Sequence, residues 1–253
     1  MRRAGEQDEP IGTLLAVPSL PSPEALERHP HLGDPCPEGW VRVDFHSHTM
    51  WSGDSTTTPE ELRESVVASG IDVLCITDHN AIRGATELVD QLPCRVVIGE
   101  ELKTYAGEII GLFLEERIPQ GIPPEDAARN IREQGGIVYV PHPFDPIRNN
   151  LRSDVLDDLV ASDLVDGIEV LNGKTSLKSL NKKASDYATA NDLAIGAGSD
   201  AHVAEALGAA YMQMPDFDNP VDFLKSMRIG QPVGHYYDPP RRWKPRIVPS
   251  TAD

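Results

Sequence analysis

Short runs of β-branched residues alternate with helix-like segments, and this alternation constrains the fold most strongly. We expect buried strands at residues 41–45, 71–77, 94–99, 108–114, 136–140, 167–171 and 193–197. Thr58-Pro59-Glu60-Glu61 has the pattern of a capped helix start, and Gly70 can end that helix. Pro124 begins another helix, which ends at Gly135. The pattern predicts one α/β domain built on a parallel sheet, either open or closed into a barrel.

The ends of the chain differ from its middle because they are rich in proline and show no sustained period. We expect a Pro-rich leader at 1–40, the barrel at 41–230 and a Pro-rich tail at 231–253. His29, His31 and His235 fall in these flanks, where we expect them to be solvated. The three cysteines show no CxxC spacing, which indicates neither a disulfide framework nor a thiolate zinc site.

Charge and hydropathy limit the partners. The chain has 23 Lys and Arg against 40 Asp and Glu, a formal net charge of −17. This balance disfavours a grip on long duplex nucleic acid, which needs many phosphate-neutralising cations. No apolar run approaches the ~18–20 residues of a membrane span, so we expect no membrane partner and a cytoplasmic location. The sequence does not predict an oligomeric state.

Histidines and acids gather directly after the expected strands. Five of the eight histidines fall there: His46, His48, His79, His142 and His202. Four acids occupy similar positions: Asp54, Asp78, Glu101 and Asp200. The carboxyl ends of parallel strands meet on one face of an α/β protein, where active sites are built. We therefore expect these side chains to converge.

Imidazole and carboxylate without thiolate suit Zn, Mn, Fe or Co. On an extended segment His46 and His48 point the same way and can share an ion, as can Asp200 and His202. A bridging carboxylate such as Glu101 can hold two ions about 3.5–4 Å apart, a spacing that activates water and clamps a phosphoryl group. Taken singly each motif is weak. Asp78, for example, can simply cap a helix.

Five stretches together resemble the PHP superfamily, the polymerase and histidinol phosphatase phosphoesterases. They are Asp44–Thr49 with Ser52–Asp54, Thr77–Asn80, Gly99–Glu101, Pro141–Pro143 and Gly198–His202, in the family's order. The resemblance implies a distorted (β/α)7 barrel, related to the TIM barrel. It also implies two or three divalent ions (Mn, Zn or Fe) at the carboxyl ends of the strands.

The resemblance also implies roles for individual residues. His46, His48, Glu101 and Asp200 resemble the ligands of one ion, with Glu101 bridging to a second that His142 also binds. Asp54, His79 and His202 resemble the surroundings of a third ion, or groups that orient water and phosphate. Glu101 is preferred to Glu100 on the same grounds.

Two departures from the family pattern stand out. Asp54 lies six residues after His48, where five is commoner, which weakens its assignment as a ligand. Glu108 stands where many trinuclear members have a histidine. A carboxylate there can still bind a metal ion, but it changes the charge of the site.

Three cations are candidates for binding an anion: Arg148, Arg152 and Lys174. Arg148 is the candidate for the catalytic site, whereas for Arg152 a plain surface position is favoured. Glu169 alternates with apolar neighbours and is expected to face the barrel interior, as a partner of a cation or of a ligating histidine.

The favoured function is a metal-dependent phosphoesterase acting on a small phosphorylated substrate, a phosphomonoester or nucleotide. His202 or Asp78 is the candidate for proton transfer. Three alternatives stay open: a 3′–5′ exonuclease on short oligonucleotides, a non-catalytic metal-binding module, and a metal hydrolase acting on bonds other than phosphoesters.

Overall fold

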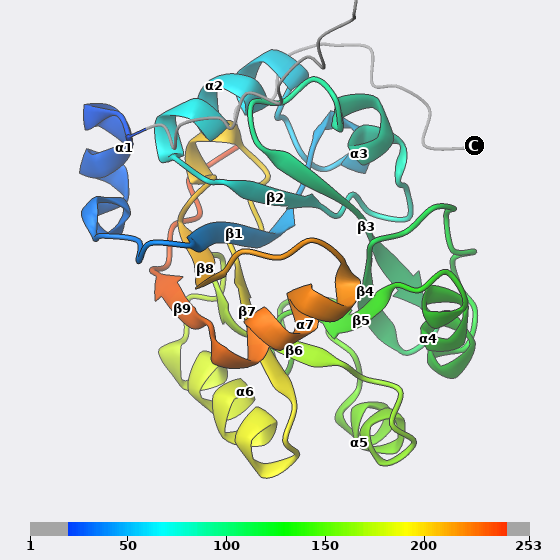
Figure 1. The fold of residues 1–253 in the computed structure, drawn as a ribbon. Coiled ribbons are helices and arrows are strands. Elements are labelled where there is room, and N and C mark those ends of the chain that lie inside the picture. The colour runs from blue at the N-terminus through cyan, green and yellow to red at the C-terminus, as the bar shows by residue number, and fades with distance from the viewer. Residues whose placement is uncertain (1–19, 242–253) are drawn as a thin grey trace, which may run out of the picture.

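A nine-stranded sheet forms the centre of the computed structural model, which describes residues 20–241 (Figure 1). Its strands are β1 (Trp40–Ser47), β2 (Val73–Ile76), β3 (Arg95–Thr104), β4 (Gly107–Leu112), β5 (Ile137–Val140), β6 (Gly167–Asn172), β7 (Ala194–Gly198), β8 (Ala210–Pro215) and β9 (Gln231–Gly234). Their order in the sheet is β7-β6-β5-β4-β3-β2-β1-β8-β9. The α/β class expected from the alternation is confirmed.

The sheet is mixed, so the expectation of a parallel sheet is only partly right. Strands β1, β2 and β3 run parallel, as do β5, β6 and β7. Strand β4 is antiparallel to both neighbours, and β8 is antiparallel to β1 and β9. Only Tyr105 and Ala106 separate β3 from β4, and a link this short can reverse the chain but cannot carry a parallel crossover.

The two ends of the sheet curl toward each other, which gives a nearly closed barrel as predicted. Ser47 at the end of β1 forms a parallel bridge with Ala201, just beyond β7. The Asp200 N–H donates to the His46 carbonyl at 2.7 Å, and the His48 N–H donates to the Ala201 carbonyl at 3.0 Å. The segments that carry three proposed ligands are therefore fixed to one another by backbone hydrogen bonds.

Helices surround the sheet (Figure 1). The α-helices are α1 (Pro23–Arg28), α2 (Pro59–Ser69), α3 (Arg83–Leu88), α4 (Pro124–Glu133), α5 (Ser153–Ala161), α6 (Lys178–Ala190) and α7 (Pro220–Ile229). Helix α2 has the predicted capping box between Thr58 and Glu61, and it ends at Gly70 in a left-handed conformation. Within residues 20–241, no helix combines the length and apolarity that crossing a bilayer requires.

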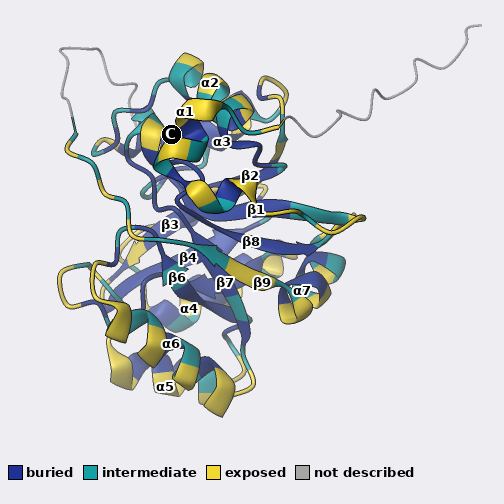
Figure 2. Ribbon diagram, turned by 90° about the vertical axis from the view of Figure 1, so that its left-hand side faces the viewer, coloured by how far each residue is buried: buried dark blue, intermediate teal, exposed yellow. Residues whose placement is uncertain are grey.

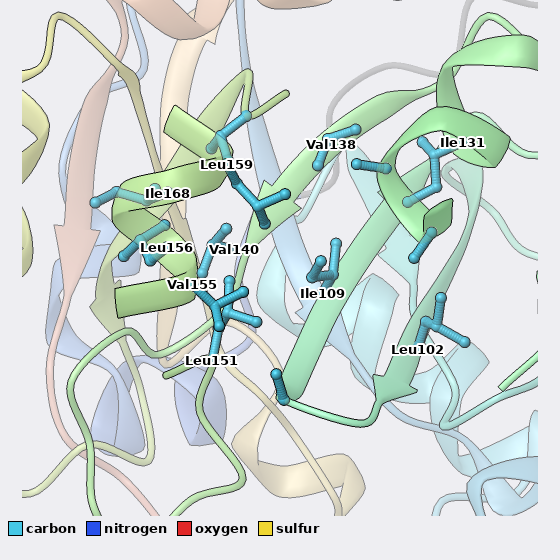
Figure 3. Close-up of a cluster of buried hydrophobic side chains, with 14 of the residues drawn as sticks. Leu102, Ile109, Ile131, Val138, Val140, Leu151, Val155, Leu156, Leu159 and Ile168 are labelled. Atoms are coloured by element: carbon cyan, nitrogen blue, oxygen red, sulfur yellow. The ribbon is translucent and has the colours of Figure 1, made fainter. Parts of the chain in front are cut away.

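Burial follows the layers of the barrel. Figure 2 shows the strands mostly buried and the outward surfaces of the helices exposed. The largest apolar cluster lies where α4 and α5 cover the sheet, with Ile131 and Leu156 packed against Ile109 and Val140 (Figure 3). Because these contacts lie outside the barrel mouth, the core holds the strand ends in place without filling the site.

The flanking histidines are not solvated as expected. His29 is 1% exposed, and its Nδ1 lies 3.2 Å from Nε2 of His235. Its Nε2 lies 2.9 Å from the Glu205 carbonyl, while Nε2 of His31 lies 2.9 Å from the Gly208 carbonyl. Contacts between segments far apart in the sequence bury the ring of His29 and leave His31 and His235 half-buried, which composition alone does not reveal. Residues 1–19 and 242–253 of the predicted leader and tail lie outside the described range, and β9 adds residues 231–234 to the sheet.

Candidate metal centre

Most of the predicted site residues come together at one mouth of the barrel, where the parallel strands have their carboxyl ends. Potential ligand atoms form four overlapping groups: His46, His48 and Glu101; His46, His142 and Asp200; His79, Glu101 and Glu108; and His48, His79 and His202. All eight were singled out from the sequence. Within each group the ligand atoms lie within 4.8 Å of one another.

Glu101 lies at the centre of these groups. Its Oε2 atom is 3.3 Å from Nε2 of His46, 3.3 Å from Nε2 of His48 and 3.1 Å from Nδ1 of His79. Its Oε1 atom lies 2.9 Å from Nε2 of His142. The two oxygens therefore face different histidines, as a carboxylate that bridges two ions does.

The packing of these atoms fits a divalent cation. Glu101 Oε2 is buried and has no hydrogen-bond partner among the described residues, although three imidazole nitrogens surround it. Nε2 of His46 and Nε2 of His48 face each other at 3.0 Å. A buried carboxylate oxygen that faces three imidazole nitrogens without a hydrogen bond is stabilised by a cation between them, and imidazole with carboxylate is a suitable donor set.

The electrostatics agree with this geometry. Burial would lower the pKa of His46, but the charges of Asp200, Glu101 and Glu169 raise it well above its ordinary value. Burial would raise the pKa of Glu101, yet the imidazoles of His46 and His79 hold it well below its usual range. Glu101 is thus held in its ionised form, and the carboxylates around His46 favour a cation at that ring.

Asp200 joins this cluster to two cations. Its Oδ1 lies 3.5 Å from Nε2 of His48, and its Oδ2 accepts a hydrogen bond from Arg148. The Lys174 ammonium donates to Oδ1 at 3.5 Å and lies 3.1 Å from Nδ1 of His202. Burial would raise the pKa of Asp200, but Arg148 and Lys174 hold it well below its usual range. Cations and acids therefore meet on one side of the cluster.

Asp54 lies on the other side, beside His79 and His202. Its Oδ2 is 2.9 Å from Nε2 of His202 and 3.5 Å from Nε2 of His79. Burial lowers the pKa of His202 to about 3, helped by the charge of nearby His48. The extra residue between His48 and Asp54 does not keep this carboxylate away from the histidines.

Glu108 reaches the cluster from the start of β4. Its Oε1 lies 4.0 Å from Nδ1 of His79, and its Oε2 lies 3.9 Å from Nε2 of His142. Burial raises the pKa of Glu108, and the nearby charge of Glu101 raises it further. A carboxylate thus occupies the space where the family pattern commonly places a histidine.

Several other side chains fix the orientation of the imidazoles. Glu169 Oε1 lies 3.2 Å from Nδ1 of His46, and its Oε2 accepts the His142 N–H at 2.7 Å. Ser52 Oγ lies 2.9 Å from Nδ1 of His48. Asn172 donates to Glu169 at 2.9 Å and to Asp200 at 3.0 Å. Sequence reasoning identified Glu169 but missed roles for Ser52 and Asn172. Ser52 lies two residues before Asp54, and Asn172 lies two residues before Lys174, which is only a weak sign of a role in the site.

Three candidates lie outside the cluster. Both oxygens of Asp78 accept hydrogen bonds from Thr49, at 2.7 Å from its N–H and 2.6 Å from its hydroxyl. Glu100, one residue from Glu101 on β3, instead accepts the Ile118 N–H at 2.8 Å. Arg152 pairs with Asp154 at 2.9 Å on the surface. Alternation along β3 explains why Glu101, and not Glu100, reaches the site.

Two of the clustered residues have a left-handed backbone, with φ of 29° at His142 and 52° at Asp200. Such angles are unfavourable for residues other than glycine and tend to occur at functional sites. The surrounding hydrogen bonds hold both side chains toward the cluster despite this cost.

Family comparisons agree with the geometry. The family described as PHP domain matches residues 44–128, and the family described as PHP-associated matches residues 178–232. An uncharacterized protein of Methanocaldococcus jannaschii is 42% identical over 146 residues, covering 52% of this chain and 82% of the relative. A second uncharacterized protein from the same organism is 35% identical over 198 residues, and the match covers 75% of this chain and 80% of the relative.

Solved structures share the fold at low identity. A two-domain protein from Bacteroides vulgatus, described as containing a predicted PHP-like metal-dependent phosphoesterase, has a TM-score of 0.64 at 18% identity. That match covers 79% of this chain and 67% of the other. Endonuclease Q, in complex with a 27-mer duplex that has an abasic lesion, has a TM-score of 0.58 at 15% identity. That match covers 75% of this chain and 56% of the endonuclease Q chain.

Endonuclease Q corrects one expectation. Net charge was expected to exclude long duplex nucleic acid as a partner, yet this neighbour binds a duplex with the same fold. A net charge of −17 averages over the whole surface, whereas binding depends on the local charge at the site. The sequence motifs, the clustered ligand atoms and the family matches together show that this chain belongs to the PHP superfamily.

Proposed function

We propose that this chain is a metal-dependent phosphoesterase that hydrolyses a small phosphomonoester or nucleotide. The observation that carries the proposal is the environment of Glu101 Oε2, which faces three imidazole nitrogens at 3.1–3.3 Å without a hydrogen bond from any described residue. Bound divalent ions would supply Lewis-acid activation of water and neutralise charge on the phosphoryl oxygens.

We assign the ligands in three sets, of which the first two share Glu101. His46, His48, Glu101 and Asp200 would hold the first ion, and Glu101, His142 and Glu108 the second. Asp54, His79 and His202 would hold a third or orient the substrate. These imidazole and carboxylate ligands suit Mn, Zn or Fe. Glu169 and Ser52 contact the Nδ1 atoms of His46 and His48, which leaves each Nε2 lone pair directed into the cluster.

Arg148 and Lys174 support phosphate binding. Both contact Asp200, and their side chains are 18% and 5% exposed, so they hold positive charge at the edge of the cluster in a partly dry environment. A guanidinium can bind two phosphoryl oxygens at once, whereas an ammonium acts as a point charge. Together they would bind the phosphoryl group and stabilise the charge that develops on it.

His202 is the better candidate for accepting a proton from the attacking water. It lies at the edge of the cluster between Asp54 and Lys174, and its lowered pKa keeps the imidazole neutral near pH 7. Both oxygens of Asp78 are engaged by Thr49, which favours a role in positioning the loop that carries Ser52 and Asp54.

An oligonucleotide substrate is the second candidate. The fold shared with endonuclease Q favours it, because that enzyme forms a complex with a duplex substrate that has an abasic lesion at its active site. A 3′–5′ exonuclease activity on short strands would use the same ions and the same cations.

Metal analysis combined with a phosphate-release screen tests both candidates. The protein as purified is analysed for bound metal, then assayed with Mn, Zn or Fe on nucleotides, sugar phosphates, short single strands and a duplex. We expect phosphate release from small monoesters, abolished in His46→Ala and Asp200→Asn and retained in the surface variant Arg152→Ala. Strand shortening without release from monoesters would favour the second candidate. Absence of bound metal and of all hydrolysis would overturn both.

A further inference from the structure

The chain continues beyond β9 as an extended segment, His235–Arg241, which we call the C-terminal strap. Its side chains alternate: those of His235, Tyr237, Pro239 and Arg241 are half-buried, whereas Tyr236, Asp238 and Pro240 are exposed. A period of two is that of an extended chain with one face against the protein. The Pro239-Pro240 pair restricts the backbone to extended conformations. Arg241 is therefore directed inward.

Two backbone hydrogen bonds attach the strap to loops of the site. The His235 N–H donates to the Ala209 carbonyl at 2.8 Å, and the Tyr237 N–H donates to the Gly173 carbonyl at 2.8 Å. The Tyr237 ring also packs edge-on against His29, with ring centroids 4.8 Å apart. Gly173 immediately precedes Lys174, so the strap passes beside one of the phosphate-binding candidates.

Arg241 ends the strap beside the loop that carries Asp54. Its Nη1 lies 3.9 Å from Oδ2 of Asp54, in the loop after β1. The strap thus runs from the loop after β6 to the loop after β1, across the carboxyl ends of the strands. Lys174 lies beside the strap, because it directly follows Gly173, whose carbonyl accepts the Tyr237 N–H.

We propose that the C-terminal strap forms one wall of the substrate site and that Arg241 binds the phosphoryl group of the substrate. This inference rests on the proposed phosphoesterase function. It adds a specificity-determining residue that lies outside the strand-end motifs and outside the matched family regions, which end at residue 232.

The contacts of Arg241 suit ligand binding better than a purely structural ion pair. Asp54 Oδ2 already lies 2.9 Å from His202, while Arg241 approaches it only to 3.9 Å and makes no hydrogen bond to any described residue. A guanidinium has five N–H donors, and no residue in 20–241 accepts a hydrogen bond from those of Arg241. Arg148, by contrast, is already hydrogen-bonded to Asp200. Arg241 therefore retains donors for the oxygens of a phosphoryl group beside the cluster.

The test uses the full chain loaded with Mn and compares Arg241→Ala and Arg241→Lys with Arg228→Ala. Arg228 is an exposed arginine of α7 that contacts Asp192, which makes it a matched control for loss of one charge. Calorimetry measures binding of inorganic phosphate, steady-state kinetics measure kcat and KM for a phosphomonoester, and metal analysis measures bound Mn.

We expect Arg241→Ala to weaken phosphate binding and raise KM by about tenfold, the usual loss for one hydrogen bond to a charged group. The change in kcat should be smaller, Arg241→Lys should recover part of the affinity, and Arg228→Ala should match the wild type. If the wild type is active and Arg241→Ala leaves the phosphate affinity and KM unchanged, this inference alone is overturned. A loss confined to bound Mn would also overturn it, because that result would show that Arg241 only serves Asp54. A wild type that neither binds phosphate nor hydrolyses esters would overturn the proposed function as well.

Discussion

At the scale of single residues, the site depends on side chains that direct the imidazoles as much as on the imidazoles themselves. Glu169 contacts His46 Nδ1, the His142 N–H and the Asn172 amide, and it is 1% exposed. One buried carboxylate therefore fixes two proposed ligands that lie on different strands. Such partners of ligating histidines set both the tautomer and the basicity of the ring.

We predict that Glu169→Gln lowers metal affinity and phosphoesterase activity by roughly 10–100-fold, the usual cost of losing the partner of a ligating histidine. The replacement keeps the shape of the side chain but removes the charge that faces His46. Metal titration and steady-state kinetics measure the effect, with exposed Glu133→Gln on α4 as the control. Equal affinity in the two variants would contradict the role of Glu169.

A second prediction concerns Glu108, which lies about 4 Å from His79 and His142. If it is a ligand, Glu108→Gln should selectively weaken one ion and leave the others bound, because only the second proposed set loses a charged oxygen. Mass spectrometry measures the metal stoichiometry of the variant, and steady-state kinetics measure its rate of hydrolysis. Unchanged stoichiometry and rate would show that Glu108 does not bind a metal ion.

Most of the ligands could be predicted from the sequence because they follow an expected strand, and strand ends are marked by hydrophobic pattern and by turns. Glu108, at the start of β4, is the exception. Asn172 also follows an expected strand, but serine and asparagine are common where strands end, so neither Ser52 nor Asn172 stands out. Arg241 lies 39 residues after His202, beyond the strand-end motifs, and only the path of the folded chain brings it beside Asp54.

At the scale of elements, the hairpin of β3 and β4 is what interrupts the parallel pattern. The sequence shows two apolar runs here, at 94–99 and 108–114, but hydrophobic pattern does not distinguish a hairpin from a crossover. Strand β3 extends to Thr104 with polar residues included, so the link shrinks to two residues and the chain must reverse. The hairpin also places Glu108 at the mouth of the barrel.

Gly107 allows this reversal. Its φ is 125°, and a Cβ atom there would lie 2.4 Å from the Asn150 carbonyl oxygen. We predict that Gly107→Ala lowers the free energy of unfolding by about 2–4 kcal/mol, from backbone strain plus overpacking. Urea denaturation measures it, with Gly121→Ala as the control, because Gly121 has φ of 74° but open space around its Cβ position. Equal losses in the two variants would show that the contact with Asn150 does not matter.

At the scale of the whole molecule, the rings of His29, His31 and His235 join the N-terminal helix, the segment after β9 and the loop that follows His202. Burial lowers the pKa of His29 to about 4, against 6.5 in an unfolded chain. Between these two values the unfolded state binds more protons than the folded state, so stability decreases as pH falls from about 6.5 toward 4.

We therefore predict that the wild type loses stability over this window more steeply than His29→Gln, which lacks the titrating ring. Urea midpoints at pH 7, 6, 5 and 4 measure the difference, and His31 and His235, whose pKa values burial also lowers, contribute to the remaining slope in both proteins. If the urea midpoints of the two proteins fall equally with pH, His29 is not a cause of the loss of stability.

The near-closure of the barrel has a consequence for the order in which the protein is made. Asp44 accepts the Ser199 N–H across 155 positions of the sequence, and the same junction joins His46 to Asp200. A growing chain that emerges from the ribosome exposes His46 and His48, at the end of β1, long before Asp200 is synthesised. Under the proposed ligand assignment, tight metal capture has to wait until the loop after β7 has emerged. Metal retention would then report that the chain has been translated through this loop and has folded.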